Sequence, residues 1–154
     1  FSPFMAPVTG APTACSIYIN TNSTADSLYV GFYSATNGRP ATLLGYATID
    51  TSATGGARVT SFTEASPDSL VFVRSTQYWY SINKDGTDTI KLASCNSAYQ
   101  PSTSPDNVVN STNEDQVNIE STAATTDPPA DVAVTAIQGS GGGGDVRAWV
   151  WLEF

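Results

Sequence analysis

The sequence contains no histidine, and this absence excludes several kinds of reactive site. Imidazole is the base of Ser-His-Asp and Cys-His nucleophile systems, and it is a usual ligand of zinc. The cysteines, Cys15 and Cys95, lie too far apart in the sequence to form a CxxC pair. We therefore expect no nucleophile-type active site, no bound metal and no cofactor.

Basic residues are few and dispersed, which limits the partners that the protein can have. Lys and Arg total 6 against 14 Asp and Glu, so the formal net charge is −8. Binding to nucleic acid or to an anionic membrane needs clustered Lys or Arg. Here the basic residues occur singly, as Arg39, Arg58, Arg74, Lys84, Lys91 and Arg147. An apolar run of ~18 residues, the length that spans a bilayer, is also absent from the sequence. We expect neither a nucleic-acid partner nor membrane insertion.

The cysteine content leaves two redox states open. In an oxidising compartment, a bridge between Cys15 and Cys95 would close a loop of about 80 residues and contribute a few kcal/mol in the chain-entropy model. In a reducing cytosol, both residues would be small buried thiols. We favour the second state, in which Cys15 and Cys95 are both reduced.

The acidic residues are the remaining catalytic candidates. Glycoside hydrolysis needs two carboxyl groups about 5 to 9.5 Å apart, one of them with a pKa raised by burial. The turn 83–88 also offers oxygen ligands for calcium, but Lys84 within it opposes a bound cation. We expect no enzymatic activity, because most of the acids lie in predicted turns or polar segments where water surrounds them: Asp50, Glu64, Asp68, Asp85, Asp88, Glu114, Asp115 and Glu120.

Alternating apolar residues in the stretch 28–50 predict two neighbouring strands. Leu28, Val30 and Phe32 recur at every second position, which is the period of a strand with one apolar face. The segment 37–40, of sequence NGRP, interrupts this pattern, because Asn and Gly tolerate positive φ and Pro has no N–H to donate. Residues 43–49 resume as a second strand.

Shorter periodic segments predict further strands along the chain. We expect the last of them, 145–154, to lie inside a sheet, because an exposed edge this hydrophobic would invite aggregation. No segment has a convincing helical period, so the total of about nine or ten strands predicts an all-β fold. Its form would be a two-sheet antiparallel β-sandwich that is jelly-roll-like. The further segments are 14–20, 58–62, 70–73, 77–82, 89–93, 116–120, 131–137 and 145–154, with Asp85-Gly86 joining 77–82 to 89–93 as a hairpin.

The chain divides into an arm and one domain. Residues 1–13 are rich in Pro, Gly and Ala and predict an extended N-terminal arm, packed either on its own domain or on a neighbouring subunit. Residues 14–154 predict a single β-sandwich domain with a long polar excursion at 95–130, where we expect partner contacts. Because the sequence starts at Phe1 rather than Met, we expect a processed or longer chain, with an upstream domain as one alternative.

Five segments within residues 14–83, roughly half of the chain, form a pattern: Gly31-Phe32-Tyr33-Ser34, Asn37-Gly38-Arg39-Pro40, Leu43-Leu44-Gly45, the turn Asp50-Thr51-Ser52-Ala53-Thr54-Gly55, and Thr76-Gln77-Tyr78-Trp79. This pattern resembles a recurrent β-sandwich domain of bacteriophage virion proteins, the capsid-decoration and tail-fibre type. The resemblance implies a virion surface protein without enzymatic activity that binds other virion subunits and homo-oligomerises, with a trimer as the expected form. Related domains also occur as secreted glycan-binding modules.

Large apolar residues suggest where such a protein would meet its partners. We predict that subunit contacts are made by the apolar residues of the arm and by the two Trp of the final strand: Phe1, Phe4, Met5, Trp149 and Trp151. The alternative function is a carbohydrate-binding module, either a receptor-binding tip or a secreted glycan-binding domain. It predicts glycan contacts at Tyr99 and Tyr33, and its discriminating feature would be an exposed aromatic cluster beside polar side chains.

Overall fold

The structure is a computed structural model of the chain, and it describes residues 1–21, 27–84, 90–92, 94–96, 119–121, 137–139, 146–148 and 150–154. All regular secondary structure in these residues is β-strand, so the predicted all-β class is confirmed for them. Within the same residues, no helix is long and apolar enough to cross a membrane. The strands are β1 (Ser2–Met5), β2 (Ala14–Thr21), β3 (Ser27–Thr36), β4 (Arg39–Asp50), β5 (Gly55–Val59), β6 (Thr63–Glu64), β7 (Gln77–Lys84), β8 (Lys91–Leu92), β9 (Ser94–Asn96), β10 (Ile119–Ser121), β11 (Ile137–Gly139), β12 (Val146–Ala148) and β13 (Val150–Glu153).

The larger sheet is built around the β3–β4 hairpin predicted from residues 28–50. Its five antiparallel strands have the order β1-β7-β3-β4-β6. Asn37 and Gly38 form the tip of the hairpin with φ values of 53° and 72°. Positive φ at both central residues is the requirement of a type I′ turn, whose twist matches that of the strands. The Asn-Gly pair therefore sets the register next to the tip, where Thr36 lies opposite Arg39, and the register shifts on either side of Tyr33 farther along β3.

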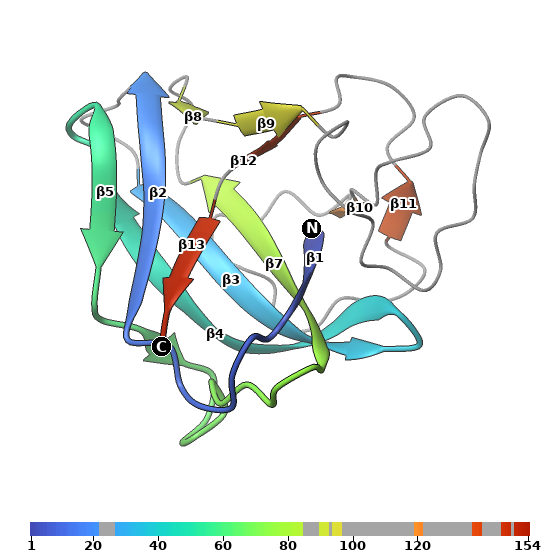
Figure 1. Ribbon diagram of the computed structural model, residues 1–154. Coiled ribbons are helices and arrows are strands. Elements are labelled where there is room, and N and C mark those ends of the chain that lie inside the picture. Colours follow the sequence, from blue (N-terminus) through green and yellow to red (C-terminus); the bar gives the residue numbers. More distant parts are fainter. Residues whose placement is uncertain are drawn as a thin grey trace.

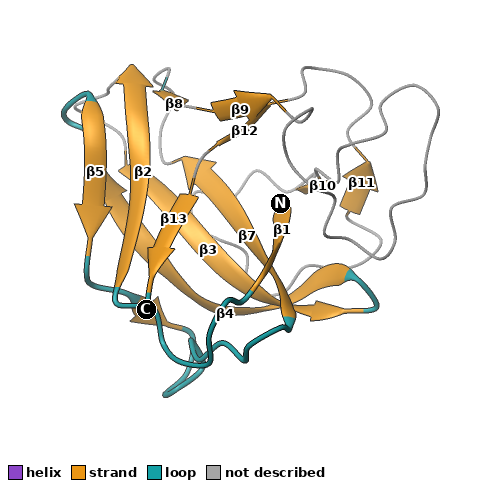
Figure 2. Ribbon diagram, in the orientation of Figure 1, coloured by secondary structure: helices purple, strands orange, loops and turns teal. Residues whose placement is uncertain are grey.

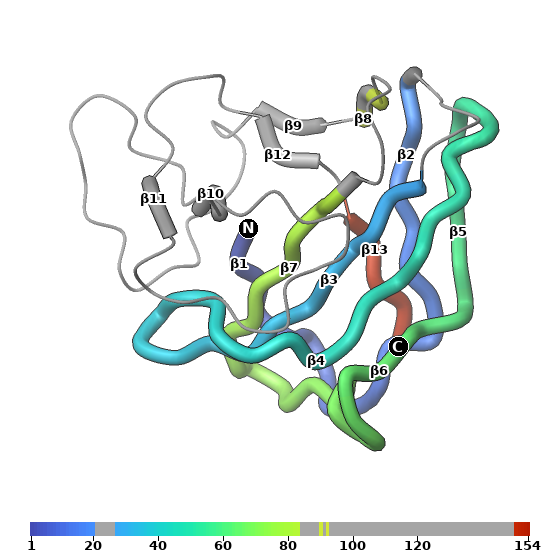
Figure 3. Tube along the Cα trace, turned by 180° about the vertical axis from the view of Figure 1, so that it is seen from behind, coloured from blue at the N-terminus to red at the C-terminus, as the bar shows by residue number. Residues whose placement is uncertain are grey.

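The smaller sheet has the antiparallel order β13-β2-β5, and the short strand β8 also pairs with β2. Figure 1 and Figure 2 show β2, β5 and β13 lying across β3, β4 and β7, and the reverse view of Figure 3 shows the same two layers from behind. Two further antiparallel pairs, β10 with β11 and β9 with β12, complete the described strands.

A shared apolar core lies between the two sheets. From β2 it receives Cys15, Ile17 and Ile19, which alternate with outward-facing residues as the sequence period predicts. From the larger sheet it receives Leu28, Val30 and Phe32 of β3, together with side chains of β4 and β7. Each sheet therefore covers the apolar face of the other.

Part of the opposite face of the larger sheet is also buried. Tyr33 on β3 is paired in register with Trp79 on β7, and both side chains have no exposed surface. Phe1 packs edge-on against Tyr33, with 5.1 Å between the ring centroids. Trp79 therefore packs inside the protein, in a second cluster with Tyr33.

The N-terminal arm lies on its own domain. β1 pairs with β7 through four residues, and the Ala6 N–H donates to the Thr76 carbonyl at 3.1 Å. Phe4 packs against the core, and its ring contacts Phe72 edge-on at 5.5 Å between centroids. Farther along, the Thr13 N–H donates to the carbonyl of Glu153 at 2.7 Å, which ties the end of the arm to β13.

Several predicted strands have different limits or partners in the structure. Residues 70–73 are not a strand and make only a single bridge between Phe72 and Gly10, because positive φ at Asp68 and at Ser75 turns the chain on either side. The strand predicted at 58–62 is β5, Gly55–Val59, and the chain leaves the sheet after Val59.

The predicted hairpin between 77–82 and 89–93 is wrong in its pairing. The strand β8 from this segment pairs with β2 in the other sheet. Pairing with β2 brings Ile90 and Leu92 of this segment against the shared core. On β7, β1 occupies only Gln77–Tyr80 of one edge, and β3 pairs along the other. The turn at 85–88 lies outside the described residues.

The last predicted strand, 145–154, is divided between two partners. β12 pairs with β9 and β13 pairs with β2. Among the described residues β13 has no second neighbouring strand, so it lies at an edge of its sheet and not inside it as predicted. Its inward residues Val150 and Leu152 still pack against the core, where they are partly buried.

Candidate functional site

Two acids in the described part of the chain, Asp50 and Glu64, serve as turn formers. Asp50 Oδ1 accepts a hydrogen bond from the Ser52 N–H at 2.8 Å, and this bond lowers the pKa of Asp50 below its ordinary value. Glu64 Oε2 accepts from the Asp68 N–H at 2.9 Å in the same way. A general acid needs a raised pKa, so the lowered pKa of Asp50 favours turn formation over catalysis at this residue.

The described residues offer little for metal binding or nucleophilic chemistry. No group of three His, Cys, Asp or Glu side chains that could hold a metal ion occurs among them. Cys15 is a free thiol, and burial raises its pKa to about 12. At neutral pH it is therefore protonated, and a protonated thiol is a poor nucleophile.

Two aromatic rings are exposed on the outer face of the smaller sheet. Tyr18 of β2 and Trp151 of β13 are 52% and 58% exposed. Both positions follow from strand alternation, because their neighbours Ile17, Ile19 and Leu152 face the core. Trp151 lies opposite Ser16 in the register. Tyr18 is two residues along β2 from Ser16, so the two rings start from diagonal positions, a separation of about 7–8 Å in antiparallel sheets.

An ion pair borders these rings on the same face. The Arg58 guanidinium of β5 donates from Nη2 to Glu153 Oε2 at 2.7 Å and from Nε to Oε1 at 3.0 Å. This two-point contact crosses over β2 and joins the two outer strands of the sheet. Both side chains remain about half exposed, at 52% and 48%. We call the set Ser16, Tyr18, Arg58, Trp151 and Glu153 the aromatic face.

Ion pairing fixes the charge state of the aromatic face. The hydrogen bond from Arg58, helped by its positive charge, lowers the pKa of Glu153, and the same pairing raises the pKa of Arg58. At neutral pH one full positive and one full negative charge therefore lie side by side. The face carries an array of hydrogen-bonding groups without a net charge.

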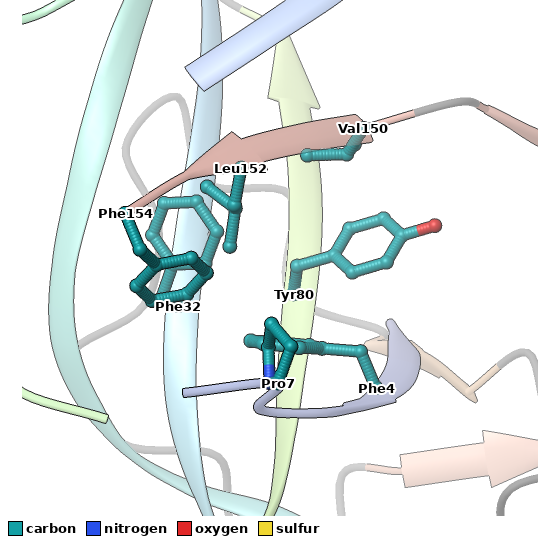
Figure 4. Close-up of a pocket in the computed structure, with 7 residues that line it drawn as sticks. All are labelled: Phe4, Pro7, Phe32, Tyr80, Val150, Leu152 and Phe154. Carbon is teal, nitrogen blue, oxygen red and sulfur yellow. The ribbon is translucent and has the colours of Figure 1, made fainter. Parts of the chain in front are cut away.

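A second surface feature is an apolar groove between the edge strands β1 and β13. Its volume is about 190 Å³. Figure 4 shows the β1 segment on one side of it, β13 on the other, and the rings of Phe32 and Tyr80 behind. We call this the edge groove, and it is lined by Phe4, Pro7, Phe32, Tyr80, Val150, Leu152 and Phe154.

The structure separates the residues predicted as subunit contacts. Met5 and Trp151 are exposed, but Phe4 lines the edge groove and Phe1 packs against Tyr33. Trp149 lies outside the described residues. These residues therefore do not form one surface: Met5 lies at the β1 edge, and Trp151 lies on the outer face of β13.

The predicted glycan contacts are not supported by the positions that can be described. Tyr33 is fully buried, so its ring offers no face on which a sugar could stack. Tyr99 lies outside the described residues. Two exposed aromatic residues do lie on one sheet face beside polar side chains, but they are Trp151 and Tyr18, not Tyr99 or Tyr33. Tyr18 could have been found from its place on the polar side of strand 14–20, between Ser16 and Asn20.

Comparisons of the chain with protein-family models, with curated proteins and with solved structures found no match.

Proposed function

We propose that the protein is a non-enzymatic structural domain of a bacteriophage virion, of the capsid-decoration or tail-fibre kind, which binds other virion subunits. Its architecture would be a jelly-roll-like β-sandwich, and its location the virion surface. The resemblance of residues 14–83 to such domains supports this proposal. So does the arrangement of the two described sheets, which share one core.

The resembling segments meet at the centre of the larger sheet. Phe32 lies opposite Gly45, and Tyr33 lies between Leu43 on one side and Trp79 on the other. Leu43 packs with the buried ring of Tyr33, whereas Leu44 packs on the opposite face, against the shared core. The pattern therefore describes how a sheet is built and supports the type of domain. Which partners the domain binds depends on its surface.

The edge groove is the observation that carries the binding role. In the described residues, β1 and β13 each pair on one side only, so each can offer backbone N–H and C=O groups at its other edge. An extended segment of a neighbouring subunit could add to such an edge and place apolar side chains in the groove, the arrangement known as β-augmentation. Exposed Met5, at the β1 edge, would lie in the same contact.

Light scattering on the intact chain tests this proposal. We expect an oligomer, and we expect Met5→Lys to shift it toward the 16.1 kDa monomer, because a Lys at a strand edge opposes strand addition. Thr48→Lys is the matched control, since Thr48 is an exposed strand residue on β4, three places from β1 in the sheet order. Removing the whole arm would be a poorer test, because it would also uncover the core around Phe4.

A monomer at every concentration, combined with no affinity for capsid or tail proteins, would contradict the proposed function. Equal dissociation by Met5→Lys and Thr48→Lys would show that added charge, and not the edge groove, controls assembly.

A further inference from the structure

We propose that the aromatic face is a binding site for a neutral carbohydrate, on which Trp151 and Tyr18 stack against sugar rings while Arg58 and Glu153 hydrogen-bond to their hydroxyls. This site is separate from the edge groove and goes beyond an assembly role. Trp151, which the sequence suggested as a subunit contact, would contact the sugar instead.

The exposed rings supply the apolar half of the site. Two large aromatic side chains that are both more than half exposed, at neighbouring positions of one sheet face, keep a substantial apolar area in water. The face of an aromatic ring carries partial negative charge, and it attracts the weakly positive C–H groups on the flat side of a pyranose. Covering both rings with such a surface would remove their apolar area from water without requiring a deep pocket.

The surroundings of Tyr18 leave space for a flat ligand. Its partner across the β2–β5 pair is Gly56, which has no side chain. A Cβ atom placed on Gly56 would have no atom within 4 Å, so the surface beside the ring is open. Two residues before Tyr18 on β2, Ser16 lies between Arg58 of β5 and Trp151 of β13 in the register. The face is thus a shallow platform with a polar border.

The ion pair supplies the polar half of the site. A guanidinium has five N–H donors, and two of its nitrogens are already used in the contact with Glu153. The remaining N–H groups and the unused lone pairs of the carboxylate can meet hydroxyls, which both donate and accept. Because each charged group holds the other in place, these groups need little ordering when a sugar arrives.

Charge selects a neutral ligand over an anionic one. Arg58 and Glu153 cancel each other, and the chain as a whole carries a net charge of −8. A phosphate, a uronic acid or a sialic acid would therefore gain no net attraction at the face and would be repelled by the rest of the protein. A sugar without charged groups avoids this electrostatic repulsion, so the ligand that fits the aromatic face is a neutral one.

Titration of the intact chain with defined neutral oligosaccharides tests the inference. The probes are cellohexaose, maltohexaose, chitohexaose and mannohexaose, with polygalacturonate as the anionic comparison, and the readouts are tryptophan fluorescence and calorimetry. We expect at least one neutral hexamer to bind, and we expect Trp151→Ala and Tyr18→Ala each to weaken it by about tenfold or more, the equivalent of about 1.4 kcal/mol. Glu153→Gln should weaken it less, since the amide retains an acceptor.

Val73→Ala is the matched control, because Val73 is 52% exposed and lies outside the aromatic face. It should bind the hexamer as the unchanged chain does. Circular dichroism of each variant establishes that it is folded. Met5→Lys should also leave sugar binding unchanged, so failure of the assembly proposal and failure of this one can be told apart.

Three outcomes would overturn the inference. One is the absence of binding by all four neutral hexamers to the folded chain. Another is tighter binding of polygalacturonate than of any neutral probe. The third is a fall in native mass on Trp151→Ala with no sugar binding, which would make the aromatic face a contact between subunits.

Discussion

At position 45 the neighbouring strand leaves no space for a side chain larger than that of glycine. A Cβ atom built on it would lie 2.7 Å from the Thr63 carbonyl oxygen and 3.3 Å from Glu64 Cα, both of them backbone atoms of the paired strand β6. Backbone cannot move aside as a flexible side chain can. We therefore expect Gly45→Ala to lower the free energy of unfolding by about 1–3 kcal/mol.

Urea denaturation measures this difference, and Gly56→Ala is its control. Gly56 is also a strand glycine, but a Cβ there would meet nothing within 4 Å. An alanine at that position should leave stability unchanged or raise it by up to about 1 kcal/mol, because it restricts the unfolded chain. Equal effects at the two glycines would mean that β6 does not lie where the structure places it.

Cys15 makes stability sensitive to alkaline pH. Burial raises its pKa from 9.0 to about 12, so between these values the unfolded chain loses the thiol proton while the folded chain retains it. Ionisation then favours unfolding, and stability should fall as pH rises from about 9 to 12. Burial raises the pKa of Tyr33 from 10.0 to about 12 as well, although nearby Ser81 lowers it, and this acts in the same direction.

Urea midpoints at pH 8 and pH 9.5 test this expectation, since Cys15 titrates in the unfolded chain before Tyr33 does. We expect the decrease over this interval to disappear in Cys15→Ala. In a Cys95→Ser background, a thiol reagent at pH 8 should label Cys15 only after unfolding. Labelling of the folded chain at the rate of a free cysteine would contradict the burial of this thiol.

Residue-level features of the surface could be predicted only in part. Alternation in 145–154 placed Trp151 on the side away from the core, and the structure agrees. The same alternation put Tyr33 on the side of β3 opposite Phe32, but sequence does not show that this face is buried by a second aromatic cluster. The pairing of Arg58 with Glu153 joins positions 95 residues apart, and no local pattern indicates it.

At the scale of elements, the turn between β3 and β4 is the most strongly determined by sequence. Gly38 has a φ of 72°, a value that a β-branched residue avoids. Gly38→Val should therefore lower the free energy of unfolding by about 1–2 kcal/mol, with the strands still paired. Asn37→Gly is the control, because Gly-Gly also suits a type I′ turn, and its effect should stay within about 1 kcal/mol. Urea denaturation of both variants checks this, and a Gly38→Val variant as stable as the unchanged chain would refute the turn type.

The position of a strand could be predicted from the sequence more readily than the strand with which it pairs. Strands at 14–20, 28–36, 43–49 and 77–82 follow from period-2 alternation, a local property of the sequence. The β3–β4 pairing could also be predicted, since a two-residue turn leaves no other partner within reach. The pairing of β8 with β2 could not, because it joins Leu92 to Ile19, far away in the sequence, and no local pattern indicates it.

At the scale of the whole molecule, the first and last strands of the chain form neighbouring edges of the two sheets. β1 is the edge strand of the larger sheet, β13 is the edge strand of the smaller one, and the edge groove lies between them. The aromatic face lies on the outer side of the same β13. A partner in the groove and a ligand on the aromatic face would thus contact opposite sides of one short strand, so assembly and ligand binding could influence each other through β13.

The shared core predicts that both sheets unfold together. Cys15 and Phe32 belong to one buried cluster although they lie on different sheets, so neither sheet can keep its apolar face covered alone. Trp79 reports the larger sheet, and Cys15 reports the smaller one. In a chain carrying Trp149→Phe, Trp151→Phe and Cys95→Ser, the fluorescence of Trp79 and the labelling of Cys15 should show the same urea midpoint. Labelling of Cys15 at a lower urea concentration would mean that the smaller sheet unfolds first. The larger sheet would then keep the packing around Phe32 without the smaller sheet.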